Sequence, residues 1–546
     1  MMKAKHDPLG SLTSNPFEHA RTWRQSIISN VKVKPEIRFD GKGFICVLVT
    51  SRCPIGCEHC MFFSNMFEDK NADNTMTQTR INSLMGLVRD SNTGYLLVSG
   101  GGEVFLEPDL MYQIVEQSRA DITWIVTAAH WGKDVERAKE IVGKMHDSFL
   151  RGEHRDHNRK ICLRVSLDSE HIRKIAGSTP HPLEYVTNII RIFESKYSNE
   201  RGFVLMIHSL KGEEALINDL CEAISGEKLA CHDPIHDNLK FTESAFTIRL
   251  KSGYEFEVTF AKLLLSDLAA DLRDKETLKK RIELFDKDAF HNERGKPAIK
   301  FNDDGSIGPN MLVVYNGRVA GGWQAEMPDV PINLDHDNFH NIMEKTLSDP
   351  GVLGTIENGL QYRFEIIQEV SPKAVLRSKA VNVRDYSSPV LLEEDKIKLY
   401  YSIRVLQDLV AQHRIDEIEM EHWPEEIRLM VSLARNELQS LFHRAKYDII
   451  RQFIESEQHF GEFVERVKQF AAERNAQTII EFFKSKPDID KRSVDKWRLL
   501  LQRIVNEWYD IRTFSDKEIQ SVADVEKILD ERILIGKRFY EGLSFR

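Results

Sequence analysis

The chain has 546 residues, which is long enough for two or three domains with sizeable cores. Its formal net charge of −10 argues against nucleic acid as a partner, because the chain has no overall attraction for polyanions. No apolar signal segment follows the first residues, and no window approaches the roughly eighteen apolar residues of a membrane span, so we expect no membrane association.

The first 210 residues divide into a polar lead and a region of alternating strand and helix patterns. The lead covers residues 1–40 and contains one amphipathic stretch, Phe17–Val31. Strand-like apolar runs follow at Phe44–Thr50, Tyr95–Ser99, Thr123–Ala129, Ile161–Asp168 and Phe203–Leu210. Helical patterns separate these runs at Thr77–Val88, Pro108–Arg119, Val135–Phe149 and Pro182–Tyr197. This alternation predicts βαβ units and a parallel sheet, whose functional residues lie at the carboxyl ends of the strands.

Three of the seven cysteines follow the first strand-like run with the spacing C-x3-C-x2-C, at Cys53, Cys57 and Cys60. A structural zinc site needs four ligands, usually as two separated pairs. A four-iron cubane held by three thiolates instead keeps one iron open to an outside ligand. The motif therefore predicts a [4Fe–4S] cluster with one open iron. That oxygen-sensitive group and the sparse cysteines both favour a reducing, cytoplasmic location.

Two further motifs end the second and fourth strand-like runs. The second run ends in Gly101-Gly102-Glu103, where the glycines allow a close approach and the carboxylate can pair with an ammonium group. The fourth run ends in Ser166-Leu167-Asp168. The cysteine spacing, followed at this distance by Gly-Gly-Glu, resembles the radical S-adenosylmethionine (SAM) superfamily.

The resemblance implies an α/β fold, a partial (β/α)6 TIM-like barrel, with SAM bound to the open iron. It places the SAM amino group on Gly101, Gly102 and Glu103, although the family often continues with Pro where this chain has Val104. It also places the SAM ribose and the substrate near Ser166 and Asp168. An Asp168 that only caps the next helix is the alternative, which the sequence leaves open.

Other candidate site residues have less specific patterns. By the resemblance, the backbone of His59 meets the adenine; as a fourth metal ligand it would strain the loop, because it adjoins Cys60. Candidate catalytic residues are His130 after the third run, Cys162 within the fourth, and Lys262. Cys162 is most simply a small buried hydrophobe, but a substrate radical can also be quenched by a thiol. A polar loop with potential ligands at Cys231, His232, Asp233 and His236 is the remaining alternative metal site, and most such loops bind nothing.

The pattern changes after the predicted barrel. Phe246–Leu250 and Tyr254–Phe260 predict an antiparallel hairpin, and Asn316-Gly317 predicts a second one between Met311–Tyr315 and Arg318–Ala320. A helix is expected near Asn338–Leu347, and from about Lys396 the pattern is helical, with Trp497 and Trp508 on one stripe. We therefore predict a lead at 1–40, a core barrel at 41–265, a mixed auxiliary region without cluster cysteines at 266–390, and an all-α domain at 391–546.

The sequence thus predicts a radical SAM enzyme that cleaves SAM to a 5′-deoxyadenosyl radical and abstracts hydrogen from its substrate. We expect a small metabolite or a peptide as substrate, within a biosynthetic pathway, and reduced flavodoxin or ferredoxin as electron donor. A glycyl-radical activase fits less well, because such enzymes carry added ferredoxin-like cysteines. The alternative from another class is a sensing protein that binds the cluster and SAM without catalysis and uses its helical domain for partner interaction.

Overall fold

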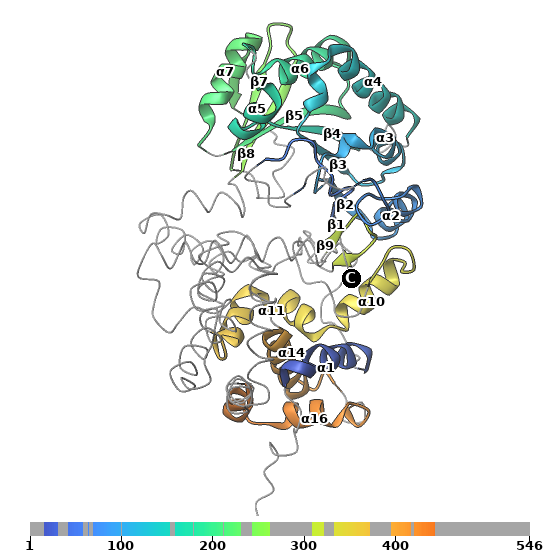
Figure 1. Cartoon of the computed structure of the whole chain (residues 1–546), viewed down its shortest axis with the longest axis vertical. Helices are drawn as coiled ribbons and strands as arrows, with labels where there is room; N and C mark the ends of the chain where they lie inside the picture. Colours follow the sequence, from blue (N-terminus) through green and yellow to red (C-terminus); the bar gives the residue numbers. More distant parts are fainter. Residues whose placement is uncertain are drawn as a thin grey trace, which may run out of the picture. The chain divides into compact units, whose positions relative to one another are not determined.

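The structure is a computed structural model that describes residues 16–30, 42–57, 64, 69–99, 101–152, 159–177, 180–210, 212–230, 243–261, 308, 310–320, 332–371, 395–415 and 420–442. These residues form two compact units. One unit contains a mixed sheet with its connecting helices, and the other contains helices alone (Figure 1). None of the helices in these ranges is long and apolar enough to cross a membrane.

The sheet has ten strands in the order β10-β9-β1-β2-β3-β4-β5-β8-β7-β6. Their bounds are β1 (Gly43–Val47), β2 (Thr93–Val98), β3 (Ile122–Thr127), β4 (Lys160–Ser166), β5 (Phe203–Leu210), β6 (Glu227–Ala230), β7 (Glu243–Arg249), β8 (Glu255–Ala261), β9 (Asn310–Val313) and β10 (Val319–Ala320). All neighbours from β9 through β1 to β5 and β8 are parallel, while β10, β7 and β6 pair antiparallel at the two edges. The predicted α/β fold with a parallel-dominated sheet is confirmed.

Six consecutive parallel strands, β1 to β5 followed by β8, have the order expected of a partial (β/α)6 barrel. Figure 1 shows β1 to β5 along an arc, with α3, α4 and α6 on its outer side. The helices of this unit are α2 (Gln78–Asp90), α3 (Pro108–Gln117), α4 (Val135–Arg151), α5 (Ser169–Ala176), α6 (Glu184–Lys196), α7 (Glu214–Ile224) and α10 (Phe339–Leu347), with short 3-10 helices η1 (Val104–Leu106) and η2 (His130–Lys133). Each long helix buries one apolar stripe, as its sequence periodicity predicts.

The two faces of the sheet differ because successive side chains of a strand point to opposite sides. On β4, Leu163 and Val165 are fully buried and belong to the core that the helices cover. Arg164 and Ser166 alternate with them and are partly exposed. The face opposite the helices therefore carries polar side chains at the carboxyl end of the sheet, where the predicted site lies.

Both predicted hairpins form, and they contribute to the main sheet. In the first, β7 pairs antiparallel with β8, and β8 also pairs parallel with β5, so that Met206 lies opposite Glu257. In the second, β9 pairs antiparallel with β10 and parallel with β1. The sequence places this second hairpin in an auxiliary region, whereas the structure adds β9 to the barrel sheet beside the strand that precedes the cysteines.

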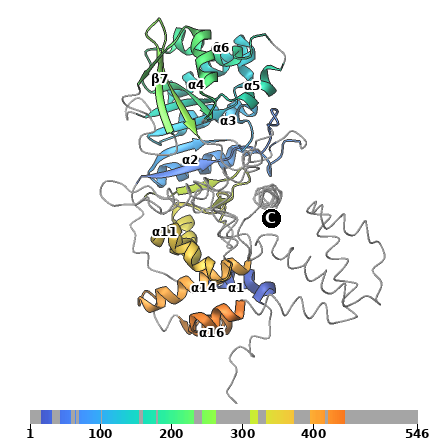
Figure 2. The ribbon, with the colours of Figure 1, turned by 90° about the vertical axis from the view of Figure 1, so that its left-hand side faces the viewer.

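The helical unit contains α1 (Pro16–Asn30), α11 (Pro350–Gln368), α14 (Asp395–Ala411) and α16 (Glu425–Ser432). Figure 2 shows α1 beside α14 with α16 beneath them. A buried ion pair joins α1 to the start of α11, with 3.2 Å between Arg24 Nη2 and Asp349 Oδ2. Asp349 also caps α11 by accepting from the backbone N–H of Gly351. The predicted helical pattern after Lys396 is found in α14 and α16, while Trp497 and Trp508 lie outside the described residues.

Candidate metal centre

The segment that leads into the cysteine loop is held on both sides by backbone hydrogen bonds. On one side Ser51 N donates to Asn74 O over 2.9 Å. On the other side Gly102 N donates to Thr50 O over 2.7 Å, and Glu103 N donates to Arg52 O over 3.0 Å. The chain just before Cys53 is therefore fixed as an extension of β1, beside the end of β2.

The two glycines after β2 are required by this close approach. Gly101 has φ +79°, a left-handed conformation that glycine adopts without strain. A Cβ atom on Gly102 would lie 2.0 Å from the carbonyl oxygen of Arg52. In addition, the Ser64 hydroxyl donates to the carbonyl of Gly101. The Gly-Gly pair thus joins the turn after β2 directly to the cysteine loop.

Cys53 and Cys57 follow this anchored segment as partly buried thiols. Two thiols four residues apart on a short loop, open on one side, suit a soft metal such as the iron of a [4Fe–4S] cluster. Cys60 and His59 lie outside the described residues, and so do Lys262 and the loop at Cys231. Without Cys60, the described residues contain no group of three His, Cys, Asp or Glu side chains that could hold a metal ion.

Glu103 is 2% exposed and points toward the end of β3. Its Oε1 accepts from the Thr127 hydroxyl over 2.6 Å and from Phe105 N over 3.1 Å, and its Oε2 accepts from Ala128 N over 2.8 Å. The carboxylate therefore ties the turn after β2 to the turn after β3. One acceptor position of Oε2 remains for an ammonium group, since an ionised carboxylate offers about four acceptor positions.

Replacing Glu103 by alanine is expected to lower the free energy of unfolding by about 2–4 kcal/mol. The change leaves the N–H groups of Phe105 and Ala128 and the hydroxyl of Thr127 buried without their acceptor. Denaturant titration followed by circular dichroism measures the loss. Glu103→Gln keeps one oxygen acceptor and is expected to retain about half of the free energy of unfolding that the alanine variant loses. An alanine variant as stable as the parent would contradict the hydrogen-bonding role.

Asp168 caps α5, which is the alternative that the sequence left open. Its Oδ1 accepts from His171 N over 2.9 Å, and its Oδ2 lies 2.5 Å from His171 Nδ1. The thiol of Cys57 lies close enough to His171 to interact with its imidazole. Burial lowers the pKa of His171, but the interactions with Asp168 and Cys57 outweigh it and raise the pKa to about 10. Asp168, His171 and Cys57 therefore form one cluster of contacts.

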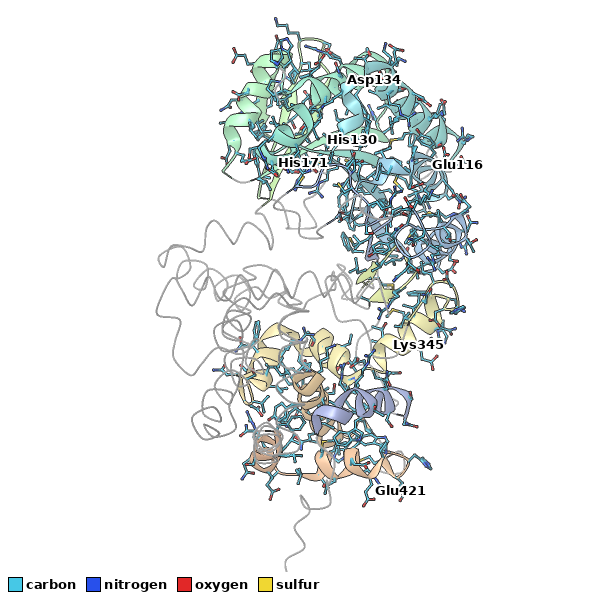
Figure 3. All side chains as sticks on the ribbon, viewed as in Figure 1. Glu116, His130, Asp134, His171, Lys345 and Glu421 are labelled. Atoms are coloured by element: carbon cyan, nitrogen blue, oxygen red, sulfur yellow. The ribbon has the colours of Figure 1, made fainter. Side chains whose placement is uncertain are left out.

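His171, which Figure 3 marks on α5, is not among the site residues predicted from the sequence. A signal for it exists, because a residue three positions after a helix N-cap lies in the first turn and can contact the capping side chain. Tyr185 of α6 lies close by: it is 1% exposed, and burial together with the charges of Asp168 and Cys57 raises its pKa. Among the described residues, the Tyr185 hydroxyl has no hydrogen-bond partner.

The polar face of the sheet extends from this cluster toward β8. Ser166, the last residue of β4, lies opposite His208 of β5, and His208 Nδ1 lies 2.8 Å from the Thr259 hydroxyl. One layer deeper, burial lowers the pKa of Arg164 to about 10, and its Nε has no hydrogen-bond partner. Cys162 is fully buried in the middle of β4, where desolvation raises the pKa of its thiol and keeps it protonated.

His130 and Trp131 follow β3 in η2. Ala129 before them has φ 58°, a left-handed conformation that turns the chain sharply at the strand end. Trp131 is buried against Phe105, with 5.1 Å between ring centroids in an edge-to-face arrangement. His130 is partly exposed, and its Nδ1 is buried without a hydrogen-bond partner. Of this pair, only His130 keeps a polar atom available for a ligand.

A family comparison bears on the segment that contains these features. Residues 39–171 match the family described as 4Fe-4S single cluster domain. The match covers Cys53 and Cys57 together with the Gly101-Gly102-Glu103 turn that adjoins them. This part of the chain is therefore similar to a domain that holds a single [4Fe–4S] cluster.

Two solved structures align with this chain at low similarity. They are native anSMEcpe with bound AdoMet and His6-tagged anSMEcpe with bound AdoMet, each 12% identical to this chain with a TM-score of 0.32. The alignments cover 68% and 70% of this chain, and 99% and 98% of those chains. At this TM-score neither likeness supports an inference about the present chain. No curated protein matches the sequence.

Proposed function

We propose that the protein cleaves SAM reductively at a [4Fe–4S] cluster held by Cys53, Cys57 and Cys60, and that the 5′-deoxyadenosyl radical abstracts hydrogen from a small metabolite or a peptide in a biosynthetic pathway. The observation that carries this proposal is the direct backbone junction between the cysteine loop and the Gly101-Gly102-Glu103 turn. That junction brings the segment with Cys53 and Cys57 and a turn suited to an ammonium group to one edge of the sheet.

The residues divide the task between them. The thiolates hold the cluster, and the free oxygen position of Glu103, with the turn around it, receives the ammonium group of SAM. When bound, the cluster and SAM supply the electron transfer and the radical. Ser166 and Asp168, at the end of β4, are proposed to lie near the ribose.

The polar face of the sheet is the proposed place for the substrate. Arg164, His208 and Glu257 line neighbouring strands there, with Met206 between Arg164 and Glu257 in register. The guanidinium of Arg164, the imidazole of His208 and the carboxylate of Glu257 give this face both hydrogen-bond donors and an acceptor. Such a face suits a polar metabolite or the main chain of a peptide. His130, which follows β3, and Lys262 stay candidate catalytic residues.

The test is anaerobic reconstitution followed by reduction with dithionite in the presence of SAM. We expect 5′-deoxyadenosine to form, as detected by liquid chromatography, and to increase with reduced flavodoxin or ferredoxin as the proposed physiological donor. A Cys53→Ala, Cys57→Ala, Cys60→Ala triple variant is the control for cluster-independent cleavage. A reduced, iron-replete protein that binds SAM but releases no 5′-deoxyadenosine would instead favour a sensing protein.

A further inference from the structure

His171 links a carboxylate to one cysteine of the predicted cluster. Its Nδ1 lies 2.5 Å from Asp168 Oδ2, so the other ring nitrogen is the one available to the thiol of Cys57. The backbone holds this arrangement in two ways, because Asp168 is the N-cap of α5 and His171 N donates to the same carboxylate. The imidazole is therefore oriented by its own helix terminus before any cofactor binds.

Hydrogen bonds to cysteine sulfur are one of the factors that set the potential of an iron–sulfur cluster. A donor stabilises the sulfur more strongly when the cluster carries the additional negative charge of the reduced state. A second residue that orients such a donor strengthens the effect, as carboxylates do for metal-bound histidines. Asp168 and His171 have this relation to Cys57.

We propose that His171, held by Asp168, donates a hydrogen bond to the sulfur of Cys57 when that sulfur ligates the cluster, and thereby raises the reduction potential of the cluster. This inference rests on the proposed function only in that Cys57 must be a cluster ligand. His171 is a positioning residue in this role, because it acts on the iron through the sulfur. The one electron that reduces the cluster comes from the external donor.

The experiment is a redox titration of the anaerobically reconstituted full-length protein, followed by the EPR signal of the reduced cluster without SAM. We expect His171→Phe to bind as much iron as the parent. Its equilibrium constant for reduction of the cluster should be about tenfold smaller, which lowers the reduction potential by about 59 mV for a one-electron couple. His171→Gln, which keeps a side-chain donor, is expected to recover part of the shift. His181→Phe, an exposed histidine of the same unit, is the matched control.

A second variant keeps the test decisive if His171→Phe fails to hold the cluster. Asp168→Asn can still cap α5 and retains the imidazole, but it replaces the anionic partner, so we expect a smaller shift in the same direction. Unchanged potentials in iron-matched His171→Phe or Asp168→Asn protein would overturn the proposal. So would nitrogen hyperfine coupling from a directly iron-bound His171. Because SAM is absent, the result is independent of whether 5′-deoxyadenosine forms.

Discussion

Replacing Cys57 by alanine is expected to remove the [4Fe–4S] cluster and to abolish 5′-deoxyadenosine formation. Three thiolates ligate three of the four irons and leave one open. With two thiolates, two irons have no protein ligand, and the protein cannot retain the four-iron cubane. The same outcome is expected for Cys53→Ala and Cys60→Ala. Iron and sulfide analysis with Mössbauer spectroscopy after reconstitution measures the loss, and the parent should contain about four iron atoms per chain.

The matched control is Cys221→Ala, on the buried side of α7. It removes a thiol that behaves as a small hydrophobe, so the iron content should equal that of the parent. Cys231→Ala is expected to behave in the same way. Iron near twice the expected amount in the parent would show a second cluster and would contradict the prediction that the region 266–390 holds none. A Cys57→Ala protein with a full cluster would refute the ligand assignment.

Replacing Gly102 by alanine is expected to destabilise the protein by at least about 3 kcal/mol and to prevent cluster binding. The added methyl group would lie 2.0 Å from a backbone oxygen at Arg52, and backbone atoms cannot move aside as a flexible side chain can. Relief requires the turn after β2 to separate from the cysteine loop, which breaks the hydrogen bond from Gly102 N to Thr50 O. Denaturant titration and iron analysis of the same preparation measure the two effects.

Gly56→Ala separates steric overlap from backbone strain. Gly56 lies between Cys53 and Cys57 with φ +64°, but a Cβ atom there would meet nothing within 4 Å. We expect this variant to lose only about 1–2 kcal/mol, the strain of a left-handed non-glycine residue, and to retain the cluster. If both variants lost stability and iron equally, the close approach at Gly102 would not be the cause.

Local periodicity predicts the elements of the barrel well but not all of their partners. The runs that become β1 to β5 are apolar and bounded by helical patterns, so their positions follow from the sequence. The parallel pairing of β8 with β5 and of β9 with β1 does not follow, because alternation within a hairpin says nothing about a third strand. Each predicted hairpin therefore contributes one strand, β9 or β8, to the parallel part of the central sheet.

The site shows the same division between what a motif encodes and what tertiary contacts decide. The approach of the Gly-Gly-Glu turn to the cysteine loop agrees with the motif order. The inward hydrogen bonds of Glu103 to Thr127 and Ala128 depend on β3 and are invisible in the motif itself. Likewise, Asp168 can be predicted as a helix cap, whereas the contact of His171 with Cys57 joins residues more than a hundred positions apart.

The pairing of β1 with β9 has a consequence for synthesis of the chain on the ribosome. Phe44 pairs with Asn310, which is made on the order of 10–50 s after it at typical elongation rates. During that interval one edge of β1, directly before the cysteine loop, lacks its neighbouring strand. Unpaired strand edges of nascent chains are where aggregation begins. Slow production at low temperature is therefore expected to increase the yield of soluble protein only if β1 is shielded until β9 emerges, for example by a chaperone.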